Sequence, residues 1–334
     1  MTQTTVIGAG VVGLCVAHAL ADRGCTVTVV APSGGPHAGA CSWWAGGMLA
    51  PGCEAESAEP LIGALAADGI AFWQACGEAE MRGTLVVAHP RDEAELRRFA
   101  AATEGHRRLE ASEIAGLEPT IGARFPAGFL FPEEGQIDPR GALSRLAVDL
   151  RARGVRFEAR EAVADDRKGH CIDARGLAAR DGLPDLRGVR GEMAMIRAPE
   201  VEITRTVRLL HPRWPLYLVP RGEGVYMIGA TQIESERQGG ATVRSVLDLL
   251  GALYALHPAF AEAEVLELGA GLRPEFPDNL PRLRWRSGAL SVNGLFRHGF
   301  LCAPALARMA AEHLLDGRWF PEVMDEDRAE RQSA

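Results

Sequence analysis

A glycine-rich turn close to the start of the chain constrains the fold more than any other feature. The segment Gly8-Ala-Gly-Val-Val-Gly13 follows residues 4–8, whose composition predicts a short buried strand. Apolar residues then recur at helical spacing as far as Gly24, and residues 26–30 are β-rich again. A strand, a glycine turn, a helix and a second parallel strand within about 30 residues form a βαβ unit of the dinucleotide-binding type.

Each glycine of this turn has a separate physical task. Gly8 permits the tight turn, Gly10 lets the backbone approach a pyrophosphate, and Gly13 lets the helix pack against the strand. The helix N-terminus, with Val11 and Val12, offers N–H groups and the positive end of the helix dipole to the phosphates. The alternative is a tight turn that only packs against its helix, which the βαβ context disfavours.

The acidic residue that normally binds the ribose hydroxyls in such a unit is absent. Ala31 takes its place at the end of the second strand, and no Asp or Glu occurs in residues 23–53. No Arg or Lys occurs in residues 24–81 either, so a 2′-phosphate has no evident partner. Ser33, or the backbone of residues 33–35, is the candidate ribose contact. A chain that had lost its affinity for the cofactor would show the same pattern.

The loop of residues 31–53 is rich in glycine and proline and carries no Asp, Glu, Lys or Arg. Within Ser42-Trp-Trp-Ala-Gly-Gly-Met48, the small residues Ala45, Gly46 and Gly47 allow the backbone N–H groups to approach a flat ring. The two tryptophans and Met48 supply apolar contact, and Ser42 is a further candidate for contact with the cofactor. An ordinary packed loop is the alternative.

The rest of the chain alternates helical and β-rich segments. Asp138 and Pro139 predict the start of a helix, because Asp caps free N–H groups and Pro fits the first turn. From Gly191 to Thr231, short β-rich runs separated by Pro and Gly favour an antiparallel sheet. We expect further helices at 59–80, 91–103, 242–256 and 304–315, a strand at 84–89, and a frayed tail after Asp325.

Composition and charge exclude several classes of protein. The 334 residues carry a formal net charge of −8 with arginines scattered among acids, so neither nucleic acid nor a membrane is an expected partner. No apolar run approaches the roughly 20 residues that span a bilayer, and we expect a cytoplasmic location. The seven cysteines form no CxxC pair or Cys/His cluster, so no metal site is expected.

Six segments are distinctive in combination. They are GAGVVG at 8–13, CSWWAGGMLAP at 41–51, PLYLVPR at 215–221, GAT at 229–231, GAGLRPEFPDNLP at 269–281 and NGLFRHGFLCAP at 293–304. Together they resemble the D-amino-acid oxidase family, and within it the glycine oxidases of thiamin thiazole synthesis. The resemblance extends from residue 3 to about residue 320, and its last two segments are more specific than the glycine turn.

The resemblance implies an α/β chain, α+β overall, in which a Rossmann-type FAD-binding domain is interleaved with a substrate domain on a mixed, largely antiparallel sheet. It places 1–80, 136–188 and 265–322 in the FAD-binding domain, 81–135 and 189–264 in the substrate domain, and 323–334 in a flexible tail. Non-covalently bound FAD would oxidise the α-amine of a small amino acid to an imine, with O2 as the final acceptor. Water would hydrolyse the imine to an oxo acid and ammonia. A homo-oligomer is expected.

The resemblance also assigns roles in the substrate site. Arg273 aligns with the arginine whose planar fork binds the substrate carboxylate, and Tyr217 aligns with the tyrosine that joins it there. Arg297 aligns with a second arginine that sets the substrate position, and Met48 is expected over the substrate or flavin face. No general base is assigned, because the expected chemistry is hydride transfer from Cα.

These assignments have structural alternatives. Arg273 could form an ion pair with Glu275 or Asp278, and the other three side chains could serve as ordinary core or loop residues. The chain also departs from some glycine oxidases at two pocket positions, with Pro215 in place of a histidine and Gln232 in place of a methionine. Both departures leave the exact substrate open.

The segment of His298, Gly299, Phe300 and Leu301 is expected to contact the flavin ring. The helix that follows is expected to begin around Pro304, and its positive N-terminal end would stabilise negative charge on the reduced ring. A satisfied loop histidine is the alternative for His298.

Glycine oxidation is the leading functional hypothesis, and oxidation or dehydrogenation of another small amine, such as sarcosine or a D-amino acid, is the closest alternative. A flavin-binding protein without catalytic activity is a third possibility, suggested by Ala31. The glycine turn taken alone would also fit a nicotinamide-dependent dehydrogenase.

Overall fold

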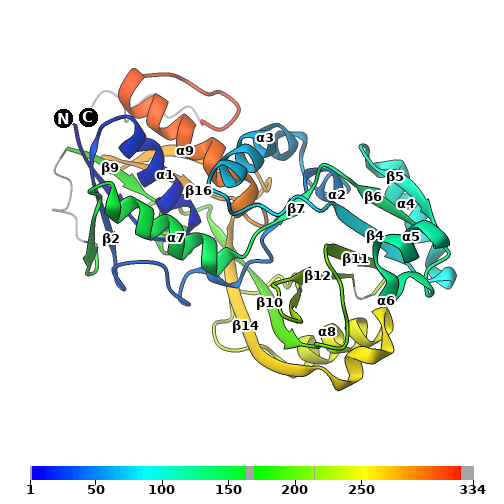
Figure 1. Ribbon diagram of the computed structural model, residues 1–334. Helices are drawn as coiled ribbons and strands as arrows, with labels where there is room; N and C mark the ends of the chain where they lie inside the picture. Colours follow the sequence, from blue (N-terminus) through cyan, green and yellow to red (C-terminus); the bar gives the residue numbers. More distant parts are fainter. Residues whose placement is uncertain (1, 163–168, 214, 325–334) are drawn as a thin grey trace.

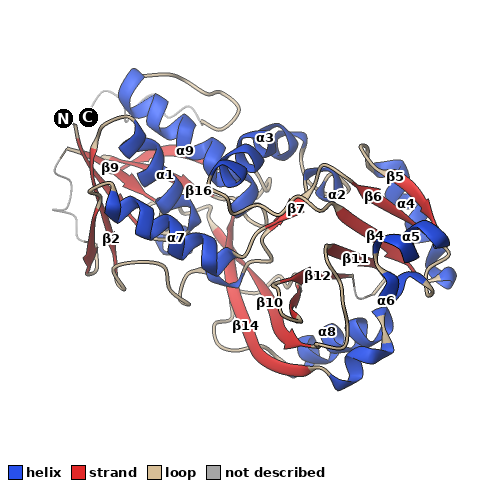
Figure 2. Ribbon diagram, in the orientation of Figure 1, coloured by secondary structure: helices blue, strands red, loops and turns tan. Residues whose placement is uncertain are grey.

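Two β-sheets organise the chain. The computed structural model describes residues 2–162, 169–213 and 215–324. A six-stranded sheet lies at the left of Figure 1, and an eight-stranded sheet lies at the right and below. Figure 2 shows helices packed against both sheets. The predicted fold, a Rossmann-type unit beside a mixed sheet, is confirmed.

The six-stranded sheet has the strand order β15-β16-β9-β1-β2-β8. The parallel strands are β1 (Gln3–Ile7), β2 (Thr26–Ala31), β8 (Arg156–Ala159), β9 (His170–Asp173) and β16 (Ala289–Asn293), and β15 (Arg282–Arg286) is antiparallel to β16. Helix α1 (Val11–Asp22) connects β1 to β2, which confirms the predicted βαβ unit.

Three more helices pack around α1. Helices α7 (Pro139–Ala152) and α9 (Gly299–Asp316) contact α1, and α3 (Pro60–Ala75) contacts α9. The predicted cap of α7 is present, because the Asp138 carboxylate accepts from the backbone N–H groups of the next turn at 3.2 and 3.0 Å. Leu143, Leu146, Ala147 and Leu150 form a buried apolar stripe along this helix.

Helix α9 begins earlier than the sequence predicted. The predicted start at Pro304 is wrong, because the helix runs from Gly299 and contains Pro304. A proline there leaves the carbonyl of Phe300, four residues earlier, without its usual backbone N–H partner. The indole Nε1–H of Trp73 donates to that carbonyl at 2.7 Å, which satisfies the carbonyl and lets the helix continue. The helix ends at Asp316, close to the predicted residue 315, and its C-cap Gly317 adopts the left-handed conformation.

The eight-stranded sheet has the order β14-β10-β13-β12-β11-β4-β6-β5. Its strands are β4 (Thr84–Ala88), β5 (Arg107–Glu110), β6 (Ala127–Phe131), β10 (Arg187–Arg197), β11 (Thr206–Leu210), β12 (Leu216–Pro220), β13 (Val225–Gly229) and β14 (Glu264–Glu275). All neighbours are antiparallel except β4 and β11, so the sheet is mixed but largely antiparallel, as predicted.

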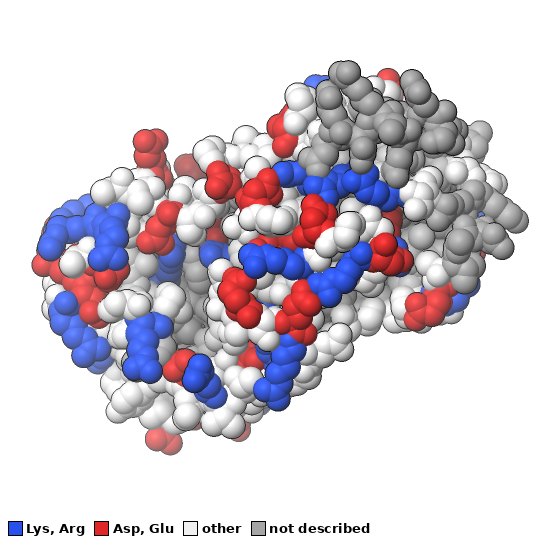
Figure 3. All heavy atoms as spheres, turned by 180° about the vertical axis from the view of Figure 1, so that it is seen from behind, with Lys and Arg blue, Asp and Glu red and all other residues white. Residues whose placement is uncertain are grey.

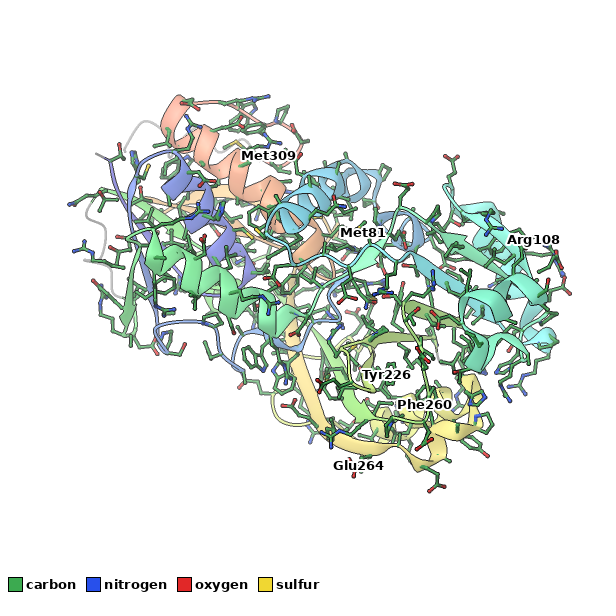
Figure 4. All side chains as sticks on the ribbon, viewed as in Figure 1. Met81, Arg108, Tyr226, Phe260, Glu264 and Met309 are labelled. Carbon is green, nitrogen blue, oxygen red and sulfur yellow. The ribbon has the colours of Figure 1, made fainter. Side chains whose placement is uncertain are left out.

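Helix α8 (Val243–Leu256) covers one face of this sheet and follows the predicted range 242–256 closely. Tyr226 of β13 and Phe260 meet edge to face with ring centroids 6.0 Å apart, and Figure 4 shows both on the α8 side of the sheet. They belong to a buried apolar cluster that includes Leu249 and Leu253 of α8. The sheet therefore has its own core, separate from the core around α1.

Short elements fill the segments between the main ones. They are η1 (Cys41–Trp44), β3 (Met48–Leu49), α2 (Pro51–Glu54), η2 (Pro90–Asp92), α4 (Glu93–Ala102), α5 (Ala111–Leu117), α6 (Pro119–Gly122), β7 (Gly135–Gln136), η4 (Gly176–Asp181) and η5 (Pro258–Glu262). The loop predicted for residues 31–53 thus contains three short elements, and β3 within it pairs with β7. The helix predicted at 59–80 is shorter, because it ends at Ala75 and the chain turns at Gly77.

Strands β10 and β14 extend from the eight-stranded sheet toward the six-stranded one (Figure 1). The predicted division of the chain into two interleaved domains stays a prediction. Of the predicted tail at 323–334, residues 325–334 lie outside the described residues, whereas Val323 and Met324 are buried.

The face seen in Figure 3 carries acidic and basic side chains interspersed with one another. No helix in the described part of the chain is both long enough and apolar enough to cross a membrane. Among the described residues, no group of three or more His, Cys, Asp or Glu side chains could hold a metal ion.

Candidate active site

The glycine turn has the geometry that the sequence predicted. Gly8 has φ +111°, and a Cβ atom there would lie 2.4 Å from the carbonyl oxygen of Ala174. A Cβ atom at Gly13 would lie 2.0 Å from the carbonyl oxygen of Gly8. Side chains are therefore excluded at both positions by backbone atoms that cannot move aside. Gly10 is the N-cap of α1 and contributes no side-chain cap, so the first turn of the helix is open to an anion.

Two segments far apart in the sequence meet at this turn. The hydroxyl of Ser42 accepts from the N–H of Val11 at 3.4 Å. A Cβ atom at Gly299, the first residue of α9, would lie 3.4 Å from a methyl group of Val11. The N-terminus of α9 therefore lies beside that of α1, and the predicted cofactor segments 8–13 and 298–301 converge.

The loop of Ala45, Gly46 and Gly47 is fixed by residues that the sequence did not single out. The Arg221 guanidinium donates to the carbonyl of Gly46 at 2.6 Å, and the N–H of Ile137 donates to that of Gly47 at 2.8 Å. Burial lowers the pKa of Arg221 to about 10. The loop is thereby held against β7 and β12, with no large side chain at these three positions.

The two tryptophans of this loop make a contact that the sequence did not predict, in addition to the apolar packing of Trp44 against Met193 and Met227. Trp43 and Trp44 both lie beside the guanidinium of Arg140, whose Cζ is 5.1 and 5.0 Å from their ring centroids. Arg140 also pairs with Glu267 of β14 at 2.7 Å. Arg140 of α7 therefore holds the tryptophan loop through a cation–π contact and β14 through an ion pair.

The turn after β2 lies where the ribose of a dinucleotide is expected. The hydroxyl of Ser33 donates to the carbonyl of Gly35 at 2.6 Å, which stabilises the turn itself. Arg151 of α7 donates to the carbonyl of Gly34 at 2.8 Å and stacks on Phe157 at 4.1 Å. The sequence did not point to Arg151, because it lies some 120 residues from the turn. The role of Ser33 stays a prediction.

These observations fit FAD. The open N-termini of α1 and α9 would face the anionic groups of the cofactor, and the uncrowded backbone at 45–47 leaves room for a flat ring. We expect Gly8, Gly10 and Gly13 with Val11 and Val12 to hold the pyrophosphate. The segment of His298 to Leu301 lies at the first turn of α9, where its backbone N–H groups are available.

A buried carboxylate, Glu54, lies at the centre of the predicted substrate site. It is 6 % exposed, at the end of α2. The Tyr217 hydroxyl donates to it at 2.7 Å, and the Arg297 guanidinium also donates to it. Burial by itself raises the pKa of Glu54, but the charges of Arg297 and His298 and the Tyr217 hydrogen bond lower this pKa to about 2. Glu54 is therefore a fixed negative charge.

His298 also faces this carboxylate, with Nδ1 4.0 Å from the Glu54 oxygen that accepts from Arg297. Burial is the main reason that the pKa of His298 is lowered to about 4, and the Arg297 charge acts in the same direction. The imidazole is neutral at neutral pH as a result.

Helix α2 places Glu54 by contacts on both sides. The backbone N–H of Cys53 donates to the Glu134 carboxyl group at 2.7 Å, and Arg208 donates to the Cys53 carbonyl at 2.8 Å. Arg208 also pairs with Glu56 and lies 5.2 Å from the ring centroid of Tyr217. Burial raises the pKa of Glu134 to about 7. Neither Glu54 nor Glu134 stood out in the sequence, because no local pattern distinguishes them from surface acids.

Arg273 of β14 has no carboxylate partner among the described residues. It donates to the carbonyl of Thr231 at 3.1 Å. Its alternative partners are occupied elsewhere, since Glu275 pairs with Arg187 and Asp278 with Arg282. Burial, reinforced by the Arg297 charge, lowers the pKa of Arg273 to about 10. Most of its donors are thus available to an anion.

Gly191 of β10 makes room for this side chain. A Cβ atom at Gly191 would lie 2.2 Å from Nη2 of Arg273. The two long strands β10 and β14 pair directly here, with Gly191 opposite Gly271. The glycine in the Arg-Gly-Glu segment at 190–192 therefore acts by leaving space for the guanidinium.

Methionines form an apolar wall beside Tyr217. Met48 is partly buried and packs with Met193 and Met227 in one cluster. The Cε atoms of Met48 and Met227 both lie 3.5 Å from the Cβ position of Gly46. Met48 therefore lies next to the loop that is predicted to face the flavin ring.

The two departures from the glycine oxidase pattern have different surroundings. The Gln232 side-chain oxygen accepts from Arg297 at 3.4 Å and belongs to the site. Both residues are exposed, but Pro215, just before β12, has no such contact with Arg297. Gln232 is therefore the one of the two that can affect the substrate directly.

The fold and this site define a class: a dinucleotide-binding protein in which the N-termini of two helices converge beside a buried cluster of arginines and a carboxylate. The family model described as FAD dependent oxidoreductase (DAO) matches residues 3–313, and the chain belongs to that family.

Individual relatives agree with this assignment. The chain is 48 % identical over 324 residues to the "Putative thiamine biosynthesis oxidoreductase ThiO" of Rhizobium etli, covering 95 % of this chain and 98 % of that protein. It is 27 % identical to the glycine oxidase of Geobacillus kaustophilus, covering 93 % and 92 % of the two chains. The crystal structure of a glycine oxidase from Geobacillus kaustophilus superposes with a TM-score of 0.79 at 23 % identity, covering 96 % of this chain and 97 % of that one. The protein is thus an FAD-dependent oxidoreductase that acts on amine donors.

Proposed function

We propose that this protein oxidises glycine, with O2 as the electron acceptor, and that its product serves thiazole formation in thiamin synthesis. The overall reaction converts glycine, O2 and water to glyoxylate, ammonia and hydrogen peroxide, through the imine of glycine. The observation that carries the proposal is the partly buried guanidinium of Arg273, which has no carboxylate partner among the described residues and lies in the electrostatic field of Arg297 and Glu54. The names of the relatives support both the substrate and the pathway.

Arg273 would bind the substrate carboxylate through its planar fork. Because the guanidinium of this β14 residue packs over Gly191 of the neighbouring strand β10, it would fix the position of Cα rather than merely attract the anion. FAD, when bound, supplies the acceptor for the hydride that leaves Cα and passes the electrons to O2.

We infer a more restricted role for Tyr217 than the one that the resemblance implies. A phenol has one hydrogen to donate, and that hydrogen goes to Glu54 here. The Tyr217 oxygen can still accept from the substrate amine, and the hydroxyl holds the Glu54 carboxylate in place. We therefore expect Tyr217, Arg297 and Glu54 to act as one unit that orients the amine.

The methionine wall would restrict the size of the substrate. Met48 and Met227 lie against the loop at 45–47, so a side chain on the substrate Cα would have to displace them. Sarcosine is a second candidate, because Gln232 gives this site a polar group that could face a substituted amine.

Anaerobic titration of the purified holoenzyme tests the proposal. The protein should be yellow, and glycine should bleach the visible absorption of its flavin. In air, glyoxylate, ammonia and hydrogen peroxide should then form in equal amounts. If FAD-loaded protein is reduced by none of glycine, sarcosine and D-alanine, the proposed amine oxidation is wrong.

The pathway needs a separate test in cells. A strain that lacks its own glycine oxidase and requires added thiazole should grow without it when this chain is expressed. A homo-oligomeric state and a cytoplasmic location also remain predictions, which light scattering and cell fractionation would check.

A further inference from the structure

Only some of the arginines in the substrate site are paired with a carboxylate. The site and its immediate support contain three arginines, Arg208, Arg273 and Arg297. Arg208 pairs with Glu56, and Arg297 pairs with Glu54. Arg273 forms no ion pair with any described carboxylate, so it is the one guanidinium of the three whose charge is not balanced locally.

The pairing of Arg297 with Glu54 is built into the fold. Only 7 % of the Glu54 side chain and 27 % of the Arg297 side chain are exposed. Tyr217 donates to the other oxygen of the same carboxylate, and helix α2 is held from both sides through Cys53. Glu54 therefore cannot swing away to release Arg297 without breaking several buried hydrogen bonds.

We propose that Glu54 determines the charge specificity of this site: it cancels Arg297, presents a negative group to the substrate amine, and excludes substrates that carry a second carboxylate. The inference rests on the proposed function, because it takes Arg273 as the group that binds the substrate carboxylate. A zwitterion with one carboxylate meets one unbalanced guanidinium and one carboxylate of opposite sign. A second carboxylate on the substrate would face Glu54, and such like-charge contact disfavours the wrong ligand.

The electrostatic coupling across the site supports this assignment. Both Arg297 and Glu54 act on Arg273, and they act in opposite directions on its pKa. A change of charge at position 54 would therefore alter the electrostatic potential at the Arg273 guanidinium, the group that binds the substrate carboxylate. Glu56 has no such relation to Arg297, since its partner is Arg208 and 31 % of its side chain is exposed.

The test compares ligands that differ by one carboxylate. Calorimetric titration of the FAD-loaded wild type with acetate and with malonate requires no turnover. We expect malonate to bind at least about tenfold more weakly than acetate. In Glu54→Gln, which keeps the shape and a hydrogen-bond acceptor, the ratio should shift toward malonate by about 10- to 100-fold. Glu56→Gln is the matched control and should keep the wild-type ratio.

Turnover gives a second readout on the same variants. Iminodiacetate is glycine with a second carboxymethyl group on nitrogen, and sarcosine carries a methyl group there instead. Glu54→Gln should raise the kcat/KM of iminodiacetate relative to that of sarcosine, again by about tenfold or more. A spectrum and a melting curve of each variant confirm that flavin is bound and the protein is folded.

Several results would overturn the proposal. The first is that the wild type binds malonate as tightly as acetate. The second is that the acetate-to-malonate affinity ratio of Glu54→Gln lies within about twofold of the wild-type ratio. The third is that Glu56→Gln shifts this ratio as much as Glu54→Gln does. If Glu54→Gln does not fold, the wild-type ratio of acetate to malonate decides alone. If wild type oxidises none of the amines but shows the expected binding ratios, the proposed function is wrong and the charge specificity stands.

Discussion

The glycine turn at 8–13 and the Glu54 cluster, which comprises Glu54, Tyr217, Arg297 and His298, use opposite means to make a binding surface. The turn consists of backbone with side chains excluded, and its shape follows from three glycines in six residues. The cluster consists of side chains from α2, β12 and the start of α9. Its first and last members are more than 240 positions apart in the sequence. A backbone site is a local property of the sequence, whereas a side-chain site exists only after the chain has folded.

This difference also decides what each region tolerates. At the turn, an added methyl group meets backbone atoms that have no alternative position. In the Glu54 cluster, removal of one partner leaves a buried charge unpaired. Substitutions at the glycine turn should therefore act through the volume of the new side chain. Substitutions in the Glu54 cluster should act through charge, and their effect should depend on pH.

The largest effect is expected from Gly13→Val. The new side chain would collide with the Gly8 carbonyl oxygen, only 2.0 Å from the Cβ position. Overpacking of this kind typically costs about 1–3 kcal/mol and also displaces the turn that holds the pyrophosphate. The purified protein should be colourless and should melt at a lower temperature. Gly63→Ala, at an exposed helical position with nothing within 4 Å of its Cβ, should keep its flavin and gain up to about 1 kcal/mol.

The next largest effect is expected from Arg273→Ala. Loss of the guanidinium that binds the substrate carboxylate should cost about 2–5 kcal/mol, which raises the glycine requirement by roughly 30- to 4000-fold. The flavin should remain bound, because Arg273 does not contact the glycine turn. Steady-state kinetics measure the glycine requirement, and the visible spectrum measures the bound flavin. Arg108→Ala, on an exposed strand at the far end of the molecule in Figure 4, should change neither. Unchanged kinetics in Arg273→Ala would remove this residue from the site.

Glu134→Gln should change the pH dependence of stability. The folded-state pKa of Glu134 is raised from 4.5 to about 7 by burial, so the folded protein holds a proton that the unfolded chain releases. Wild type should therefore lose stability, by roughly 3 kcal/mol, as the pH rises from the unfolded value through the folded one. Urea unfolding at about pH 5 and about pH 8 should show this loss in wild type but not in Glu134→Gln. Glu133→Gln, at the exposed neighbouring position, should behave as wild type. An unchanged slope in Glu134→Gln would contradict a protonated Glu134.

Tyr217→Phe should give the smallest effect. It removes one hydrogen bond to a carboxylate that Arg297 still pairs, and bonds to charged groups contribute about 1.5–3 kcal/mol. The kcat/KM for glycine should fall by roughly 10- to 100-fold while the flavin content stays constant. Tyr226→Phe is the matched control, because its hydroxyl bonds only to the backbone of Val201 and Ile203 in the core. It should lower the melting temperature and leave kcat/KM intact. If Tyr217→Phe instead lowered the melting temperature and left kcat/KM intact, Tyr217 would serve only as a core residue.

The sequence by itself determined the βαβ unit, the cap of α7, the largely antiparallel sheet and the family. Each of these depends on local pattern: glycine spacing, a helix cap, alternating residues between turns, or a short motif. The failure at Pro304 shows the limit, since the helix passes through this proline only because Trp73, on another helix, satisfies the Phe300 carbonyl. No local rule contains that contact.

Tertiary structure alone decided the charges of the substrate site. Arg273 and Arg297 could be named from their motifs, but whether each was paired depended on carboxylates from distant segments. Glu54 looks like a surface acid in the sequence and is buried between Tyr217 and Arg297 in the fold. The reason is physical: a charge acts through space over several ångströms, so its partners are set by the packing of elements and not by their order along the chain.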